Sequence, residues 1–153
     1  MVSKEEKALR AAFHLLKFRM RSVSELKDRL SRKGFDEQIV REVISKLKQQ
    51  NYLNDEIYAE SLVMSRTKKN YGPLKIKHEL QQKGVATELI EALLENLVPE
   101  ENLEAFAQKK LSSYRGIEPE LALQRLSRNL LRRGFTPEQV YETCRKIRAK
   151  IAK

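Results

Sequence analysis

Apolar residues recur along this chain at intervals of three and four, which is the spacing of an amphipathic helix. Between Lys4 and Met20, for example, Leu9, Phe13, Leu16 and Met20 are predicted to form one apolar stripe. No stretch alternates apolar and polar residues over the length of a strand. The pattern therefore predicts an all-α fold of short helices, each ordered by burying its apolar stripe because it is too short to be stable alone.

One helix-ending signal occurs three times at a fixed distance. Lys33-Gly34-Phe35, Lys83-Gly84-Val85 and Arg133-Gly134-Phe135 place their glycines 50 residues apart. A leucine stands four residues before each glycine, and Leu or Ile stands eight before. Glycine permits the left-handed backbone that ends a helix, and a basic residue favours the negative helix end. Self-similarity at a fixed period predicts tandem structural repeats.

Each repeat is predicted to contain a helix, a short turn, a second helix, the glycine turn and a third helix. We place the repeats at residues 1–51, 52–98 and 99–153. Three helices of this length enclose only a marginal core, so stacking of neighbours should supply the remaining stability. We therefore expect an elongated, gently curved rod. The helix from Pro119 to Arg133 is predicted to be about one turn longer than its counterparts.

The stretch from Tyr52 to Val85 carries the densest set of helix start and stop signals. An N-cap residue followed by an acid begins one helix, a Gly-Pro pair ends it and begins the next, and a Lys-Gly pair closes that one. The residues concerned are Asn54, Asp55, Gly72, Pro73, Leu80, Lys83 and Gly84. Two further helix starts have the capping-box pattern, Ser22 with Glu25 and Thr136 with Gln139.

The net charge and its distribution along the chain indicate what kind of partner the protein binds. The formal net charge is +10, divided as +6, −2 and +6 over residues 1–50, 51–100 and 101–153. A basic chain with clustered charge favours a polyanionic partner, either nucleic acid or a nucleoprotein, with an anionic membrane as the weakest candidate. A charge that serves only solubility is the alternative that composition leaves open.

Several other classes of protein are disfavoured. No apolar run approaches the roughly 20 residues of a membrane span, and residues 1–10 lack the apolar core of a signal peptide. The single cysteine excludes an internal disulfide and favours localisation in the reducing cytoplasm. Cys144 occupies the position of Ile44 and Leu94, so we interpret it as a core residue, and His78 as an exposed polar one. With no Gly-rich phosphate loop or metal-ligand spacing, the sequence predicts no enzyme, metal or cofactor.

The helix before each glycine has a polar face that differs among the repeats. The positions nine, six and two residues before the glycine share this face. They are Glu25, Asp28 and Arg32, then Lys75, His78 and Gln82, then Arg125, Arg128 and Arg132. A row of guanidinium groups can grip phosphates or carboxylates in pairs. We therefore predict binding by the three arginines of the last set, the alternative being a solvated face with pairing to Glu118 or Glu120.

A second basic cluster surrounds Gly72. Its members are Arg66, Lys68, Lys69, Lys75 and Lys77, with Tyr71 among them. These residues and Arg133 are further candidates for contact with a nucleic acid or a filament. The helix dipole equally favours cations at a helix end, and we favour packing of Tyr71 against Pro73 over stacking on a base. Lys75 and Lys77 lie on opposite flanks of their helix, so the cluster cannot form one patch there.

The stretch from Tyr52 to Val85, flanked by the two outer glycine turns, resembles the bacterial RecX family. It contains Y-L-N-D-E-I-Y-A-E, then S-R-T-K-K-N-Y-G-P-L-K-I-K-H-E-L-Q-Q-K-G-V. The resemblance implies tandem three-helix repeats in a cytoplasmic modulator, usually an inhibitor, of the recombinase RecA. It further implies binding to RecA and its filament on DNA, damped ATP hydrolysis, strand exchange and coprotease activity, and roles in DNA repair, homologous recombination and the SOS response.

These expectations combine into one hypothesis and two alternatives. A monomeric, basic rod of repeats suits the groove of a helical nucleoprotein filament, where it could bridge two protomers. The first alternative is a sequence-tolerant DNA-binding protein that acts directly through its basic faces. The second is an adaptor that meets only acidic proteins and has no affinity for DNA.

Overall fold

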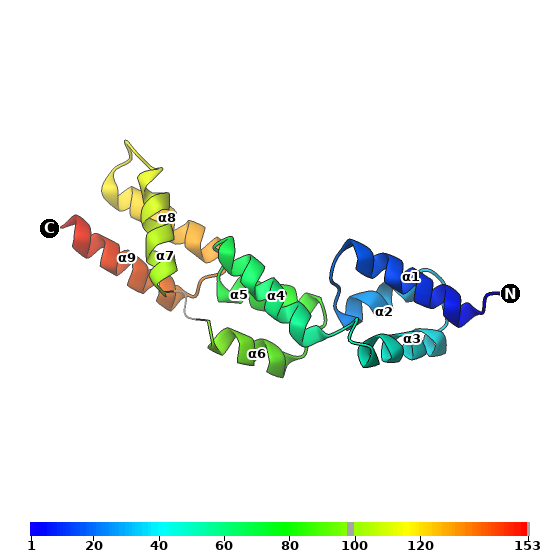
Figure 1. Ribbon diagram of the computed structural model, residues 1–153. Coiled ribbons are helices and arrows are strands. Elements are labelled where there is room, and N and C mark those ends of the chain that lie inside the picture. Colours follow the sequence, from blue (N-terminus) through cyan, green and yellow to red (C-terminus); the bar gives the residue numbers. More distant parts are fainter. Residues whose placement is uncertain (98–99, 153) are drawn as a thin grey trace. The chain divides into compact units, whose positions relative to one another are not determined.

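The computed structural model describes residues 1–97 and 100–152, which contain nine α-helices and no strand (Figure 1). The helices are α1 Lys4–Phe18, α2 Val23–Arg32, α3 Glu37–Gln49, α4 Asp55–Lys68, α5 Pro73–Gln82, α6 Thr87–Glu95, α7 Glu100–Ser112, α8 Pro119–Arg132 and α9 Pro137–Ile151. The all-α class and the tandem order of helices are confirmed. The repeat boundaries stay predictions, and the one between residues 98 and 99 lies outside the described part of the chain.

The helix ends follow the capping signals in the sequence. The Ser22 hydroxyl accepts from the Glu25 N–H at 3.1 Å, and the Glu25 carboxylate accepts from the Ser22 N–H at 3.2 Å, which completes the predicted capping box. The three repeated glycines have φ of +97° at Gly34, +75° at Gly84 and +94° at Gly134. A side chain is strained in this region, which explains why glycine stands at each turn.

Two compact units make up the chain, Met1–Ser61 with Leu80–Ile90 and Leu62–Glu79 with Glu91–Lys153. In the first unit, α1, α2 and α3 pack against one another. Their core includes Ala8, Ala12, Leu15, Leu26, Leu30, Val40, Val43, Ile44 and Leu47. In the second unit, α7, α8 and α9 enclose an equivalent core. It includes Leu103, Ala107, Leu123, Leu126, Leu130, Phe135, Val140 and Ile147.

The buried face of α1 differs from the predicted stripe. Ala8 and Ala12 are fully buried, whereas Phe13 is 36% exposed and Met20, just beyond the helix, is 46% exposed. The true face is thus displaced by one residue, which corresponds to about 100° around the helix. Two alanines let α1 approach α3 closely, and Phe13 instead meets the ring of Tyr52 edge-on at 5.0 Å between centroids. Small residues, which hydrophobicity alone undervalues, decided the orientation.

The second helix of the third repeat is longer, as the sequence predicts. Helix α8 has 14 residues, against 10 each in α2 and α5. The extra residues lie at its N-terminal end, where Glu118 accepts from the backbone N–H groups of Glu120 and Leu121, each at 3.1 Å. None of the helices in the described residues is long and apolar enough to cross a membrane.

Candidate functional site

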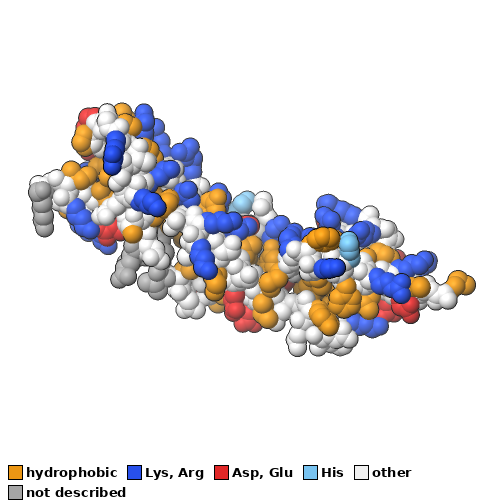
Figure 2. Space-filling model, turned by 45° about the horizontal axis from the view of Figure 1, so that its top comes forward, with side chains coloured by type: hydrophobic (Ala, Val, Ile, Leu, Met, Phe, Trp, Pro, Cys, Tyr) orange, Lys and Arg blue, Asp and Glu red, His pale blue; other side chains and the backbone are white. Residues whose placement is uncertain are grey.

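An exposed face of α8 carries the three arginines singled out by the repeat. Leu123, Leu126 and Leu130 bury the opposite side of the helix, so Arg125, Arg128 and Arg132 project into solvent. Their seven-residue span corresponds to about 10 Å along the helix. Figure 2 shows Lys and Arg side chains on the part of the molecule that α7–α9 form, as on the rest of the face in view. We call Arg125, Arg128 and Arg132 the arginine face.

The arginine face is electrostatically uncompensated within the described part of the chain. None of its three guanidinium groups forms an ion pair or a side-chain hydrogen bond there. The two acids proposed as intrahelical partners are engaged elsewhere. Glu118 caps α8, and Glu120 pairs with Arg148 at 2.7 Å. An anion from a partner can therefore bind this face without first displacing an internal carboxylate.

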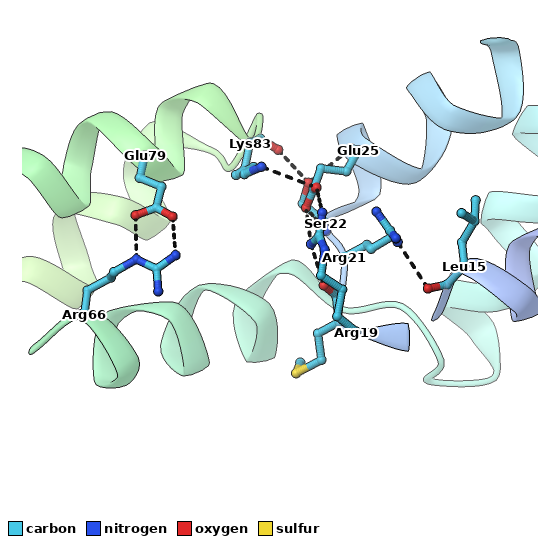
Figure 3. A network of polar contacts seen from close by, with 9 residues as sticks. Leu15, Arg19, Arg21, Ser22, Glu25, Arg66, Glu79 and Lys83 are labelled. Atoms are coloured by element: carbon cyan, nitrogen blue, oxygen red, sulfur yellow. Dashed lines mark hydrogen bonds and ion pairs between the residues drawn. The ribbon is translucent and has the colours of Figure 1, made fainter. Parts of the chain in front are cut away.

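The equivalent face of α2 is neutralised internally (Figure 3). Glu25 accepts from Arg19 at 2.6 Å and lies 3.5 Å from the Lys83 ammonium. Asp28 pairs with Arg32 at 3.1 Å. Burial by itself would raise the pKa of Glu25, but the hydrogen bonds from Arg19 and Ser22 and the charges of Arg19 and Lys83 outweigh it and hold that pKa at about 2. This carboxylate is therefore a structural anion.

In the basic cluster near Gly72, some side chains have partners within the chain and others are exposed to solvent. The Arg66 guanidinium grips Glu79 with two hydrogen bonds, of 2.8 Å from Nε and 2.5 Å from Nη2. Lys68 and Lys69 are exposed, and no ion pair holds them within the described residues. Lys77 is half-buried. Because Arg66 already has a carboxylate partner, Lys68 and Lys69 are the members best placed for an external anion.

Tyr71 and Arg133 belong to a contact inside the second unit. The ammonium of Lys75 lies 4.3 Å from the centre of the Tyr71 ring, and the Arg133 guanidinium lies 5.5 Å from it. Arg133 also lies 4.8 Å from the Phe106 ring centre and donates to the carbonyls of Lys69 at 3.1 Å and Asn70 at 3.4 Å. Arg133 thus caps the C-terminal end of α4, where the helix dipole favours a cation.

The motif residues of the middle repeat lie where the repeats meet. At the first junction, the Ser22 hydroxyl donates to the Lys83 carbonyl at 2.6 Å, and the Val23 N–H donates to the Asp55 carboxylate at 2.8 Å. A Cβ on Gly84 would lie 2.5 Å from the Ser24 hydroxyl oxygen. The start of α2 therefore rests directly on the glycine turn that ends α5, and that turn must be glycine.

The second junction repeats this arrangement with different chemistry. The Gly72 N–H donates to the Arg133 carbonyl at 2.7 Å, and the Leu74 N–H donates to the Gly134 carbonyl at 2.8 Å. A Cβ on Gly134 would lie 2.5 Å from the Lys75 backbone nitrogen. Ser22 and Gly72 are equivalent by the 50-residue period, as are Lys83 and Arg133, so the same carbonyl is used twice. Pro73 stands where Val23 offers its N–H, so no acceptor is needed there.

Sequence reasoning missed the partners that tie these residues down. It treated Lys83 and Arg133 as caps of their own helices, whereas each contacts a segment distant in sequence, and it did not pair Glu79 with Arg66. The 50-residue period carried one usable signal, since it aligns Ser22 with Gly72 directly before each second helix. Long-range pairs such as Arg66 with Glu79 have no such signal.

Two groups of residues were candidates for chemistry, the possible metal ligands and the single cysteine. Among the described residues, no group of three His, Cys, Asp or Glu side chains is placed to hold a metal ion. Cys144 is half-buried in the core of the third repeat. Burial raises the pKa of its thiol, which disfavours the thiolate that a nucleophile needs.

Comparison with known proteins identifies the three repeats individually. Models of the first, second and third three-helix domains of RecX match residues 8–47, 54–94 and 99–144. The regulatory protein RecX of Pasteurella multocida is 35% identical over 135 residues, which cover 86% of this chain and 82% of that protein. The RecX of Caldanaerobacter subterraneus is 35% identical over 133 residues, and that of Halalkalibacterium halodurans 37% over 143. This chain spans only 64% and 53% of the length of those two relatives.

Solved structures share the fold. The crystal structure of RecX from Lactobacillus salivarius has a TM-score of 0.83 at 24% identity, with 95% of this chain and 97% of that one covered. A second crystal structure, of a regulatory protein RecX, has a TM-score of 0.80 at 27% identity and covers 93% of this chain and 73% of that one. The resemblance recognised in the sequence is confirmed: this chain belongs to the RecX family of regulatory proteins.

Proposed function

We propose that this chain is a modulator, in the main an inhibitor, of the recombinase RecA. It binds RecA and its nucleoprotein filament on DNA, within the filament groove, and damps ATP hydrolysis, strand exchange and coprotease activity. It acts as a monomer in the cytoplasm, by binding alone, without a cofactor and without catalysing a reaction. Membership of the RecX family supports this proposal, because the family's implied partner is RecA.

The arginine face is the observation that carries the proposal furthest. Three exposed guanidinium groups without internal carboxylate partners favour binding to phosphates or to an acidic protein surface. A nucleoprotein filament offers both. Lys68 and Lys69 are secondary contacts. Arg133 contributes by holding the third repeat to the second. Arg66, Lys75 and Tyr71 contribute through contacts within the second repeat.

The test compares RecA ATPase activity and filament length on single-stranded DNA with and without this chain. The double variant Arg128→Glu with Arg132→Glu should bind the filament about 10- to 100-fold more weakly and lose inhibition, since each phosphate contact adds to affinity. Its helix content and thermal unfolding should match those of the unaltered chain, because both side chains are exposed. Undiminished inhibition by this variant would contradict the role of the arginine face.

A matched control separates local contact from overall charge. Arg10 and Lys17 lie on α1, seven residues apart, exposed and without an ion pair among the described residues. Changing both to Glu removes the same charge, so a loss of inhibition equal to that of the Arg128 and Arg132 variant would indicate a non-specific effect of net charge.

The second candidate function is direct, sequence-tolerant DNA binding through the basic faces. The net charge of +10 favours it. A salt titration on naked DNA decides between the two: tight binding with a steep salt dependence in the absence of RecA would favour the alternative. Inhibition that requires contact with RecA, and weak affinity for naked DNA, would favour the first proposal.

A further inference from the structure

A groove in the third repeat has no role in the proposed arginine contact. It lies between α8 and α9 and has a volume of about 400 Å³. Its apolar lining consists of Leu123, Leu131, Pro137, Val140, Tyr141 and Cys144. Leu131 is 45% exposed and Tyr141 is 68% exposed. A groove of this volume can accept two or three apolar side chains of a partner.

The other two repeats indicate that the fold does not require this apolar surface. By the 50-residue period, Leu131 corresponds to Ser31 and Gln81. Tyr141 corresponds to Arg41 and Glu91. The first and second repeats thus fold with polar residues at both positions. Leu131 and Tyr141 are therefore better explained by binding than by the stability of the repeat, because an exposed Leu and Tyr side by side gain nothing from water.

The surroundings of the groove are basic. Together α8 and α9 carry seven basic and three acidic side chains. Two of the basic residues line the groove, and both form surface ion pairs, Arg145 with Glu142 at 3.0 Å and Arg148 with Glu120 at 2.7 Å. Exposed pairs of this kind contribute little, so a carboxylate of a partner can replace the internal acid at small cost. Arg128 of the arginine face lies one residue along α8 from Ser127, which also lines the groove.

We propose that this groove binds an acidic, amphipathic segment of RecA, with apolar side chains seated against Leu131 and Tyr141 and carboxylates against Arg145 and Arg148. The inference rests on the proposed function, which supplies the partner. A protein segment fits better than nucleic acid, since six of the eleven lining residues are apolar and Tyr141 is the one aromatic ring among them on which a base could stack. An apolar anchor within a basic rim is the arrangement of a helix-in-groove interface.

The repeat supplies the variants for the test. Leu131→Ser with Tyr141→Arg introduces the residues of the first repeat, and Leu131→Gln with Tyr141→Glu those of the second. Both pairs should fold, as circular dichroism and thermal unfolding would verify, because other repeats of this chain carry them. Met64→Gln is the control, since Met64 is an apolar residue of α4 that is 62% exposed and lies outside the groove.

The measurement is affinity for RecA protomers without DNA, and separately affinity for naked single-stranded DNA. Both double variants should bind RecA about tenfold more weakly or worse, whereas Met64→Gln should bind as the unaltered chain does. The double variant Leu131→Ser with Tyr141→Arg should keep its DNA affinity undiminished, because it adds a positive charge.

The outcomes separate the two levels of the proposal. RecA binding that is equal for the unaltered chain and both double variants would overturn the groove assignment and leave the proposed function standing. Absence of RecA binding by the unaltered chain would overturn both. Loss of DNA affinity in the variant with Tyr141→Arg would overturn the assignment in favour of nucleic acid, since it would show that Tyr141 stacks on a base.

Discussion

The second helices of the first and third repeats bury equivalent apolar stripes, but their exposed polar faces differ in charge. In α2, the face consists of Glu25, Asp28 and Arg32, and every charge has a partner within the chain. In α8, all three positions are arginine, and none has a partner among the described residues. The apolar stripe that forms the core is therefore the same in both repeats, whereas the residues of the polar face can differ without disturbing that core.

Helix length gives the physical reason for this difference. Glu25 is the third residue of α2, where a carboxylate completes the capping box and meets the positive helix end. Helix α8 begins four residues earlier relative to its glycine, so Arg125 is its seventh residue and lies one turn deeper in the helix than Glu25 does in α2. There the dipole no longer disfavours a cation. Extending one helix by a turn converts a junction position into an exposed one.

The largest expected loss of stability comes from replacing a glycine at a junction between repeats, in comparison with a glycine turn that contacts no other repeat. Gly134→Ala should lower the free energy of unfolding by about 2 to 4 kcal/mol, because left-handed strain adds to a clash with the Lys75 backbone. Gly34→Ala has the same kind of strain, with φ of +97°, and no heavy atom within 4 Å of the new methyl group. It should cost only about 1 kcal/mol. Urea unfolding of both variants measures the difference, and equal losses would refute the importance of the junction contact.

A smaller effect tests whether the two junctions use their basic residue in the same way. Arg133→Lys should cost about 2 kcal/mol, since a lysine cannot donate to two carbonyls and lie over two rings at once. The reverse change, Lys83→Arg, should be nearly neutral, because the Lys83 side chain makes only a 3.5 Å contact with Glu25. Thermal unfolding of the two variants gives the comparison. A loss from Lys83→Arg as large as that from Arg133→Lys would indicate equivalent junctions.

The smallest effect concerns the charge of Glu25. Its pKa in the folded chain is about 2, below the ordinary 4.5, so its contribution is fully present above pH 4.5 and is lost as the pH falls towards 2. Glu25→Gln should cost about 1 kcal/mol at pH 6, less than the full shift implies because its partner Arg19 is half exposed to solvent. The difference from the unaltered chain should shrink as unfolding is measured at pH 4, 3 and 2. A constant difference would contradict the assigned role of the charge.

Local signals in the sequence predicted most of the helices and their ends. Ser22, Asn54 and Pro73 begin their helices through neighbours within three or four residues, so these capping roles follow from the sequence alone. The orientation of α1 did not follow, because the close approach allowed by Ala8 and Ala12 depends on α3. The sequence also did not predict that Arg66 and Arg133 are held by partners within the chain, since Glu79 and the Lys69 carbonyl lie 13 and 64 residues away.

The two junctions also limit how the repeats could be rearranged by engineering or by duplication. The first needs a hydroxyl at position 22 and an acceptor at Asp55 for the Val23 N–H. The second needs a bare backbone at Gly72, and Pro73 has no N–H to satisfy. A chimera that placed Val23 before the third repeat would bring an N–H group without the carboxylate that receives it. The repeats of this chain are therefore not interchangeable, because each junction needs residues that the other junction lacks.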